Sequence, residues 1–471
     1  MASKGGGGVG GRGGGDAVLR QYIAVGTASL SFFIQGTSLG WPSPTIEKLK
    51  ATTPITDAQI SWMVSVLYFG NFLSPIPAGY LMDRMGRKRM LVTLSILPIL
   101  SWVLVIFSTD PLILYVSRFL GGLWAGISAT VIPMYQAEVS QPQVRGALST
   151  FIQIMTYIGV CYEYILGPFV SYTTLGLLNV AIPVMFVSAF MWMPESPYWY
   201  TINNRKEEAL EALTWLRSGL PRSTIEDELQ LIEHSVREEM KNKKTFSDLI
   251  STRGNRRGLL IVEMLAIFQR MSGISGVMAF TSITIKPFTI FGILMTPDIC
   301  VIIMGVVWII STFISTALVD RSGRRPLLMT SSLGSGVAMT LIAIWFFLDR
   351  QTTLNVSHTQ FLPFLGLLIY GLFFSIGMGP IASTIQGETF PANTKAKASA
   401  ITSISLAVTS FIMNKIYLDV ENTIGMYFNF ILFASACFMC LGFVVFFVIE
   451  TKGKTLHDIQ EELNTKKSDL V

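Results

Sequence analysis

Charged residues and histidines are scarce in this chain. Only 14% of the 471 residues are charged and three are histidines, whereas a soluble domain carries about 25% charged residues. This composition excludes a soluble multidomain enzyme, a disordered chain and a nucleic-acid-binding protein. The net charge of +5 is small for the length, so we expect it to reflect membrane orientation and not an acidic partner.

Cysteine is equally rare, and the usual signatures of catalysis are missing. The four cysteines lie in apolar stretches, so we expect packing residues and neither a disulfide nor a metal site. The sequence contains no nucleophile–base pattern, metal-ligand spacing or nucleotide-binding loop. We therefore predict neither an enzyme nor a cofactor. Residues 1–15 are dominated by glycine, and we expect 1–20 to form a disordered cytoplasmic tail.

Apolar sequence, in contrast, is abundant. Hydrophobic residues make up 51% of the chain, and a span needs about 20 of them, so about twelve spans fit. Twelve apolar runs are present, at about 21–41, 58–81, 90–108, 111–134, 147–170, 177–193, 258–281, 299–319, 326–348, 361–386, 398–418 and 424–449. The sequence therefore predicts an all-α membrane protein with twelve transmembrane helices.

The runs divide into two groups of six. We predict an N-terminal six-helix bundle over 21–199, a cytoplasmic linker over 200–257, a C-terminal bundle over 258–450 and a cytoplasmic tail over 451–471. The linker is rich in charge, with apolar residues at helical spacing, which predicts short amphipathic helices on a membrane surface. These apolar residues are Leu210, Leu213, Leu216, Ile225, Leu229 and Ile232.

Lysine and arginine predict the orientation of the spans. Ten of them lie in the short loops on the side of the termini, against four in the loops of the other side, which places both termini in the cytoplasm. The single Asn-x-Ser/Thr sequon, at Asn355, then falls in an extracellular loop, where glycosylation is possible.

Three charged clusters occur twice, in the same order, each after an even-numbered span. The segment 83–88 (DRMGRK) matches 320–325 (DRSGRR), Glu138 matches Glu388, and Glu195 matches Glu450. One such cluster could be a topology signal alone, but three in order indicate two tandem halves. We expect the halves to face each other, with a site at mid-membrane between them.

These residues also carry a family resemblance. Gly79–Arg89 and the Asp320 cluster resemble the loop signature of the major facilitator superfamily. Pro133-x-Tyr135-x-x-Glu138, Pro194-Glu195-Ser196 and Glu450-Thr451 resemble its sugar-porter branch, and Gly36–Pro44 resembles insect sugar transporters, the facilitated trehalose transporters among them. The resemblance implies two pseudo-symmetric six-helix bundles and facilitated diffusion of a sugar across the plasma membrane by alternating access.

The clustered charges predict ion pairs at the cytoplasmic ends of the spans. Arginine suits them because its planar fork binds carboxylates in two places. The family implies that such pairs join the halves while the site faces outward, so we interpret them as conformational latches; the alternative is that they are orientation signals. The residues are Asp83, Arg84, Arg87, Glu138, Arg145, Glu195, Asp320, Arg321, Arg324, Glu388, Lys395 and Glu450.

The sugar site itself departs from the family. Gln153 and Gln269 match positions implied to touch the sugar, the alternative being hydrogen bonds to backbone. Arg270 stands where the family has glutamine, Ser275 where it has asparagine, and Ser383 where it has tryptophan. A second family tryptophan, near Leu406, is also missing, so we expect a wider and less aromatic pocket.

Arg270 and Glu163 are charges inside predicted spans. An arginine at mid-membrane costs about 2.5–3.5 kcal/mol, so Arg270 needs a partner: Glu163, an anionic or strongly polar substrate, or water. Ser38 stands where proton-coupled relatives are expected to carry an acid, which favours passive facilitation. Glu163 keeps proton-coupled symport open, and transport of another polar or anionic solute or a non-transporting sugar sensor are further alternatives. The sequence predicts no oligomeric state.

Overall fold

The computed structural model describes residues 12–241, 248–290, 292–390 and 392–464, which are almost entirely helical. Within these ranges, eleven helices are long and apolar enough to cross a membrane. The remaining predicted span is present as two pieces, α3 (Asp57–Leu73) and α4 (Pro75–Met85). They part at Ser74, because Pro75 has no N–H to continue the helical hydrogen bonds.

The N-terminal half supplies six spans. Its first helix begins at Arg12, so the expected disorder of 1–20 is wrong for residues 12–20, while 1–11 lie outside the described residues. Besides α3 and α4, the half comprises α1 (Arg12–Gly40), α2 (Pro42–Thr52), α5 (Arg87–Leu94), α6 (Ile96–Phe107), α7 (Pro111–Val139), α8 (Pro142–Leu166) and α9 (Tyr172–Phe190).

Four helices follow in the linker: α10 (Pro197–Ile202), α11 (Lys206–Leu216), α12 (Arg222–Lys241) and α13 (Asp248–Ser251). Leu213 of α11 packs with Ile225, Leu229 and Ile232 of α12 in a small core of their own. The predicted amphipathic helices are therefore present, but their apolar faces cover each other instead of facing outward to a membrane.

The C-terminal half repeats the six spans, with two of them broken. It comprises α14 (Arg253–Met271), α15 (Ile274–Thr284), α16 (Pro297–Ser322), α17 (Arg324–Gln351), α18 (Leu362–Ile376), α19 (Ile381–Thr389), α20 (Ala392–Thr423) and α21 (Met426–Phe447). A short hairpin of β1 (Phe288–Ile290) and β2 (Ile293–Met295) follows α15, and the one-turn helix η1 (Ser357–Thr359) precedes α18. The last helix, α22 (Leu456–Asn464), buries Ile459 and Leu463 against this half.

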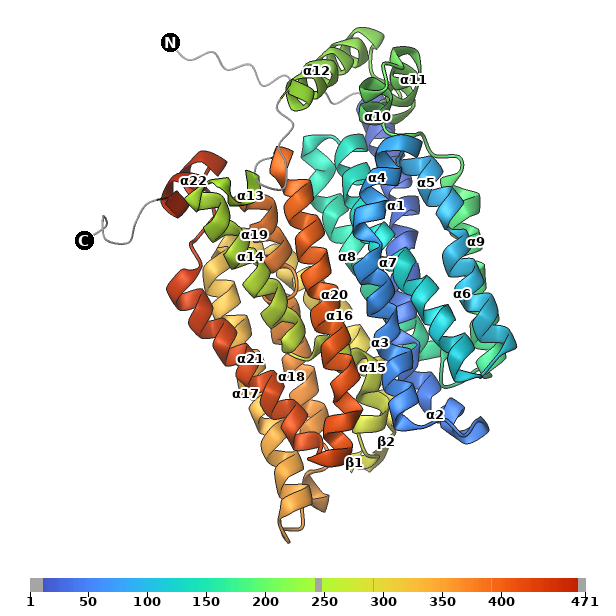
Figure 1. Cartoon of the computed structure of the whole chain (residues 1–471), viewed down its shortest axis with the longest axis vertical. Helices are drawn as coiled ribbons and strands as arrows, with labels where there is room; N and C mark the ends of the chain where they lie inside the picture. Colours follow the sequence, from blue (N-terminus) through green and yellow to red (C-terminus); the bar gives the residue numbers. More distant parts are fainter. Residues whose placement is uncertain (1–11, 242–247, 291, 391, 465–471) are drawn as a thin grey trace, which may run out of the picture.

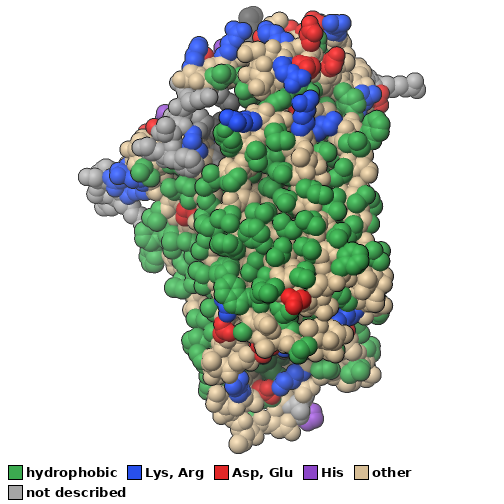
Figure 2. Space-filling model, turned by 45° about the vertical axis from the view of Figure 1, so that its right-hand side comes forward, with side chains coloured by type: hydrophobic (Ala, Val, Ile, Leu, Met, Phe, Trp, Pro, Cys, Tyr) green, Lys and Arg blue, Asp and Glu red, His purple; other side chains and the backbone are tan. Residues whose placement is uncertain are grey.

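The two ends of the molecule differ. The helices α10–α13 and α22 gather at one end, called the linker end here, and α2 and the β1–β2 hairpin lie at the other, the hairpin end (Figure 1). Hydrophobic side chains dominate the middle of the surface, while acidic and basic side chains are concentrated toward both ends (Figure 2). This distribution is that of a multi-pass membrane protein.

The halves meet where α3 packs on α20 and α8 packs on α16. At the hairpin end their apolar cores are continuous, because Trp41 and Tyr164 join the core of the C-terminal half. Side-chain hydrogen bonds close the same end: Tyr164 donates to the carbonyl of Met278 (2.7 Å), and Asn422 donates to Asp57 (3.1 Å). Nearer the linker end, residues such as Tyr135 and Phe190 form a separate core within the N-terminal half.

Candidate functional site

The charge network of the N-terminal half begins at a turn. Gly86, with φ +91°, separates α4 from α5. The carboxylate of Glu195 accepts hydrogen bonds from the backbone N–H groups of Arg87 (2.9 Å), Lys88 (2.9 Å) and Arg89 (3.3 Å). These N–H groups have no partner within the helix, so Glu195 caps α5 and its charge complements the helix dipole.

A buried ion pair lies beside this cap. Arg87 Nη2 is 2.7 Å from Glu138 Oε1, and the two side chains are only 3% and 11% exposed. Tyr135, on the same helix as Glu138, donates through its hydroxyl to the carbonyl of Pro194 (2.9 Å). The pair and the cap thus connect α5, α7 and the segment after α9.

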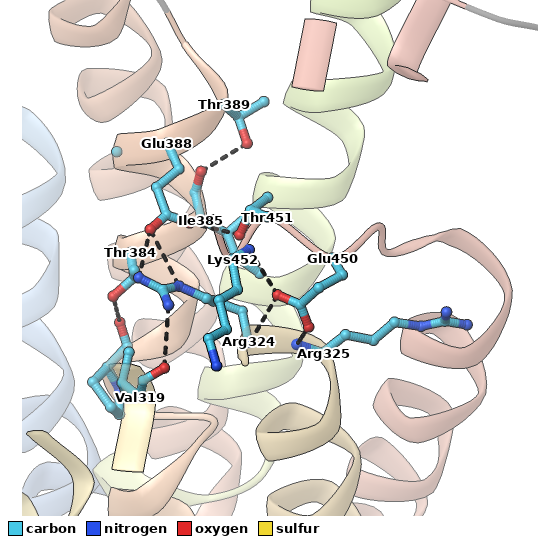
Figure 3. A network of polar contacts seen from close by, with 12 residues as sticks. Val319, Arg324, Arg325, Thr384, Ile385, Glu388, Thr389, Glu450, Thr451 and Lys452 are labelled. Atoms are coloured by element: carbon cyan, nitrogen blue, oxygen red, sulfur yellow. Dashed lines mark hydrogen bonds and ion pairs between the residues drawn. The ribbon is translucent and has the colours of Figure 1, made fainter. Parts of the chain in front are cut away.

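The C-terminal half contains the same arrangement (Figure 3). Gly323, with φ +86°, precedes α17, and Glu450 accepts from the backbone N–H groups of Arg324 and Arg325, both at 3.0 Å. Arg324 also binds Glu388 through Nε (3.1 Å) and Nη2 (2.8 Å). Burial alone would raise the pKa of Glu450, but backbone donors, Lys452 and Arg324 first among them, outweigh it and lower that pKa.

The sequence repeat is therefore a structural repeat, with each of these pairs inside its own half. Latching between the halves stays a prediction for another state of the protein. Arg145 donates to the carbonyls of Ala137 (3.1 Å) and Ser140 (3.3 Å), and Lys395 donates to that of Gly387 (3.2 Å). Burial, and then the nearby charge of Arg145, lower the pKa of Lys395, so these two cations of opposite halves lie close together.

The remaining predicted network residues contribute less. Arg84 stacks over the ring of Tyr80, 4.5 Å from its centroid, and Asp83 accepts through its backbone carbonyl from Trp199 (2.9 Å). The backbone carbonyl of Arg321 accepts from Lys452 Nζ (2.7 Å). The side chain of Asp320 lies outside what the structure describes.

Two broken helices meet near the middle of the C-terminal half. The break between α14 and α15 falls at Gly273, which has φ +95°. Gln269 Nε2, just before it, donates to the carbonyl of Gly379 (2.7 Å), in the break between α18 and α19. Gln269 thus makes the hydrogen bond to backbone that was its alternative role, and this bond joins the two breaks.

Gln153, Tyr157 and Arg270 come together where the halves face each other. Gln153 and Tyr157 lie one turn apart on α8, and Tyr157 lies near Arg270 of α14 and Ser375 of α18. The ring of Tyr157 is 6.2 Å from that of Trp308, on α16. Both rings are buried in the core that the two halves share. The sequence could have indicated Tyr157 as a site residue, because it lies one helical turn after Gln153.

The three serines that the sequence analysis assigned to the site do not lie together. Ser275 is buried and hydrogen-bonded to Ser410 of α20 (3.1 Å), and Ser38 is buried in α1. Ser383 is exposed and donates to the carbonyl of Pro380 (2.7 Å). The structure brings Gln153 and Arg270 to the boundary between the halves and turns the hydroxyl of Ser275 toward α20.

Glu163 is fully buried in α8, beside Arg118 of α7 and Asn179 of α9. Arg118 lies over the ring of Trp41, 5.4 Å from its centroid. No ion pair joins Glu163 to Arg270 among the described residues. Sequence reasoning missed Arg118, although it is the one basic residue in the run 111–134.

Comparisons with known proteins agree with this architecture. The family model "Sugar (and other) transporter" matches residues 26–463. The facilitated trehalose transporter Tret1 of Aedes aegypti is 31% identical over 95% of the chain, and that of Culex quinquefasciatus 30% identical over 94%. The chain spans about half the length of the Aedes protein (55%) and 86% of the Culex protein.

Solved structures show the same fold. The xylose transporter XylE from Escherichia coli in an inward-open conformation superposes with a TM-score of 0.78 at 20% identity, covering 94% of this chain and 99% of that one. The proton:xylose symporter XylE bound to 6-bromo-6-deoxy-D-glucose gives 0.74 at 21% identity, covering 95% and 99%. The chain has the fold of the major facilitator superfamily and belongs to the sugar (and other) transporter family.

Proposed function

We propose that the protein is a facilitative sugar transporter that works by alternating access of its two halves. The observation that carries the proposal is that polar side chains of both halves, Gln153 and Arg270 with Gln269 beside it, lie at their boundary. The halves are packed and hydrogen-bonded together at the hairpin end. A site between two such halves opens to one side at a time when they rock against each other.

The linker end is proposed to face the cytoplasm and the membrane to be the plasma membrane. Ten of the loop cations counted in the sequence belong to this end, as the positive-inside tendency requires. Asn355 is exposed in the loop before η1, on the side opposite the linker. Glycosylation tests the orientation: endoglycosidase should shift the electrophoretic mobility of the protein from a eukaryotic host, and Asn355→Gln should abolish the shift. A protease-protected Asn355 loop in intact cells would contradict it.

Uptake by the purified protein in liposomes tests the transport proposal. Radiolabelled trehalose, glucose, a polyol and an organic anion are compared, without and with a pH gradient. Saturable uptake of a sugar, and counterflow from liposomes preloaded with it, are expected. Binding of sugar without any uptake would favour the sensor alternative.

Proton-coupled symport is the second candidate, favoured by the buried Glu163. An acid within a membrane span is costly and is typical of proton relays. The groups facing Glu163 are Arg118 on α7 and Asn179 on α9, with Gly40 of α1 packed against it. If coupling operates, an inward proton gradient should accelerate uptake, and Glu163→Gln should remove that acceleration. Facilitation predicts uptake that is insensitive to the gradient.

A further inference from the structure

Arg270 is a cation in the membrane interior with no acid of its own. Its guanidinium makes no hydrogen bond or ion pair with any residue that the structure describes, and its Nε is buried. The side chain is partly exposed and lies near Tyr157 and Tyr370, both at the boundary between the halves. A positive charge within a membrane span is stabilised by an anion or by water.

Two acids lie within the spans nearest to Arg270, and neither forms an ion pair with it. Glu163 lies beside Arg118, which makes Arg118 a contrasting intramembrane arginine that has a carboxylate within its own half. Glu263 lies seven residues before Arg270 on α14, which is two helical turns, and its Oε1 accepts from Thr402 Oγ1 (2.6 Å). Arg118 therefore has a carboxylate nearby within its own half, without a direct ion pair to it, whereas Arg270 has none nearby in the part of the chain that the structure describes and faces the boundary.

The groups around Arg270 are neutral and rich in hydrogen-bonding capacity. Gln153 and Tyr157 lie across the boundary on α8, and Gln269 is the adjacent residue on α14. Amides and phenols donate and accept hydrogen bonds and therefore suit a polyhydroxylated ligand. The site combines one unmatched positive charge with donors and acceptors for hydroxyl groups.

We propose that the substrate is a sugar acid, and that Arg270 binds its carboxylate while the neighbouring amides and hydroxyls bind its polyol. This inference rests on the proposed transport function and narrows its substrate class. The planar fork of arginine accepts a carboxylate in two places. A single carboxylate also matches the single charge, whereas a sugar phosphate would bring a charge of about −1.5 to −2 and leave part of it uncompensated.

Binding to the detergent-solubilised full chain provides the first test. Calorimetric titration compares glucuronate with glucose, two hexose rings that differ in one carboxylate. Glucuronate should bind about tenfold or more tightly than glucose at pH 7, because only glucuronate offers a carboxylate to the guanidinium. Glucose 6-phosphate serves as the second anion and should bind more weakly than glucuronate.

Two substitutions at Arg270 and one control locate the effect. Arg270→Gln should remove most of the preference for glucuronate over glucose, since glutamine keeps hydrogen-bonding capacity without charge. Arg270→Lys should retain an intermediate preference because the charge remains without the fork. Arg256→Gln, an exposed arginine on the same helix, should change neither affinity. Melting temperatures of all variants establish that they are folded.

Equal affinity of the unmodified protein for glucose and glucuronate would overturn the inference. A preference for glucuronate that persists in Arg270→Gln would also overturn it. A different result would contradict the transport proposal alone. In that case glucuronate would bind in an Arg270-dependent way, but liposomes containing the protein would take up neither glucuronate nor glucose. In the expected case, labelled glucuronate enters the liposomes, and Arg270→Gln raises its half-saturation concentration about tenfold or more relative to that of glucose.

Discussion

The two halves have the same charge network at the linker end and differ within the membrane spans. At the linker end each half has a glycine with positive φ, a carboxylate capping the following helix and an arginine bound to a second carboxylate. Farther from that end, the N-terminal half contains Arg118 near Glu163, toward the hairpin end, while the C-terminal half contains Arg270 without an acid, next to the helix breaks. The repeat is thus kept at the turns of the linker end and lost within the membrane spans.

Removing one carboxylate from each charge network should show whether the two networks contribute equally to the free energy of unfolding. Glu138→Ala leaves Arg87 buried without its partner, which costs about 3–5 kcal/mol. Glu388→Ala should cost less than half as much, because the Arg324 and Glu388 side chains are 12% and 28% exposed and Arg324 keeps the carbonyl of Val319. Melting temperatures in detergent check the order. Equal losses would mean that burial does not distinguish the two pairs.

The glycines of the two turns should also differ in their tolerance of a side chain. Both have ψ near 160°, a region open essentially to glycine, so alanine costs about 1–3 kcal/mol at either. A Cβ at Gly86 would lie 2.4 Å from Glu195 Oε2, and one at Gly323 2.8 Å from Glu450 Oε2. We expect Gly86→Ala to lower the melting temperature more than Gly323→Ala. Alanine at exposed Gly146, where nothing lies within 4 Å, should have little effect.

Acid should weaken the cap of the C-terminal half. Because the pKa of Glu450 is held below its ordinary value of 4.5, its contribution is complete above that value and is lost as the pH falls through the lowered pKa. Glu450→Gln should cost about 1–2 kcal/mol near pH 7. The difference in melting temperature between the unmodified protein and the variant should shrink as the pH falls below 4.5 and through the lowered pKa. A difference that stays constant throughout the acid titration would show that the charge of Glu450 is not what caps α17.

The smallest expected effect lies at the hairpin end, where the halves share no repeat. Burial, and then the carboxylate of Asp298 across the boundary, raise the pKa of Glu47, while Lys50 opposes them. Separation of the halves would remove Asp298, so the closed hairpin end binds the proton more tightly. This favours closure at low pH, and the preference is lost as the pH rises through the raised pKa.

Thiol labelling measures this preference. Ser282 lies at a contact between the halves, so the cysteine of Ser282→Cys reports on their separation. An impermeant thiol reagent should label this cysteine more slowly at pH 5 than at pH 7.5. The slowing should exceed the one that the protonation of a free thiol causes. Adding Glu47→Gln should remove the excess. The effect should correspond to less than about 1 kcal/mol because Glu47 is partly solvated. An unchanged excess in the double variant would assign it to other groups.

Much of this fold could be predicted from hydropathy and the recurrence of charged clusters. The twelve apolar runs predicted the spans. The recurrence of the charged clusters predicted that the second half has counterparts of Gly86, Arg87 and Glu195. Helix breaks such as those at Ser74 and Gly273 were not predicted, because a break changes backbone hydrogen bonds without changing the hydropathy of the run. Arg118 was missed for a related reason: the apolar residues around it mask one charge in any average over a span.

The candidate site was predicted less completely than the fold. Gln153 and Arg270 could be named from the sequence, but their shared neighbour Tyr157 depends on how α8 and α14 face each other. The surroundings of Glu163 could not be predicted for the same reason. They depend on the rotation of α8 about its own axis, which places Glu163 toward α7 and α9 while Tyr157 points to the other half.

The network of the first half has a consequence for biosynthesis. Its members, from Gly86 through Arg87 and Glu138 to Glu195, all precede residue 200, and none of their contacts described here involves the second half. When the ribosome has delivered the first six spans to the membrane, the chain already contains every group that this network needs. The first half can therefore form its helix cap and its buried ion pair while the second half is still being synthesised. The later spans then pack against a half whose charge network is already formed.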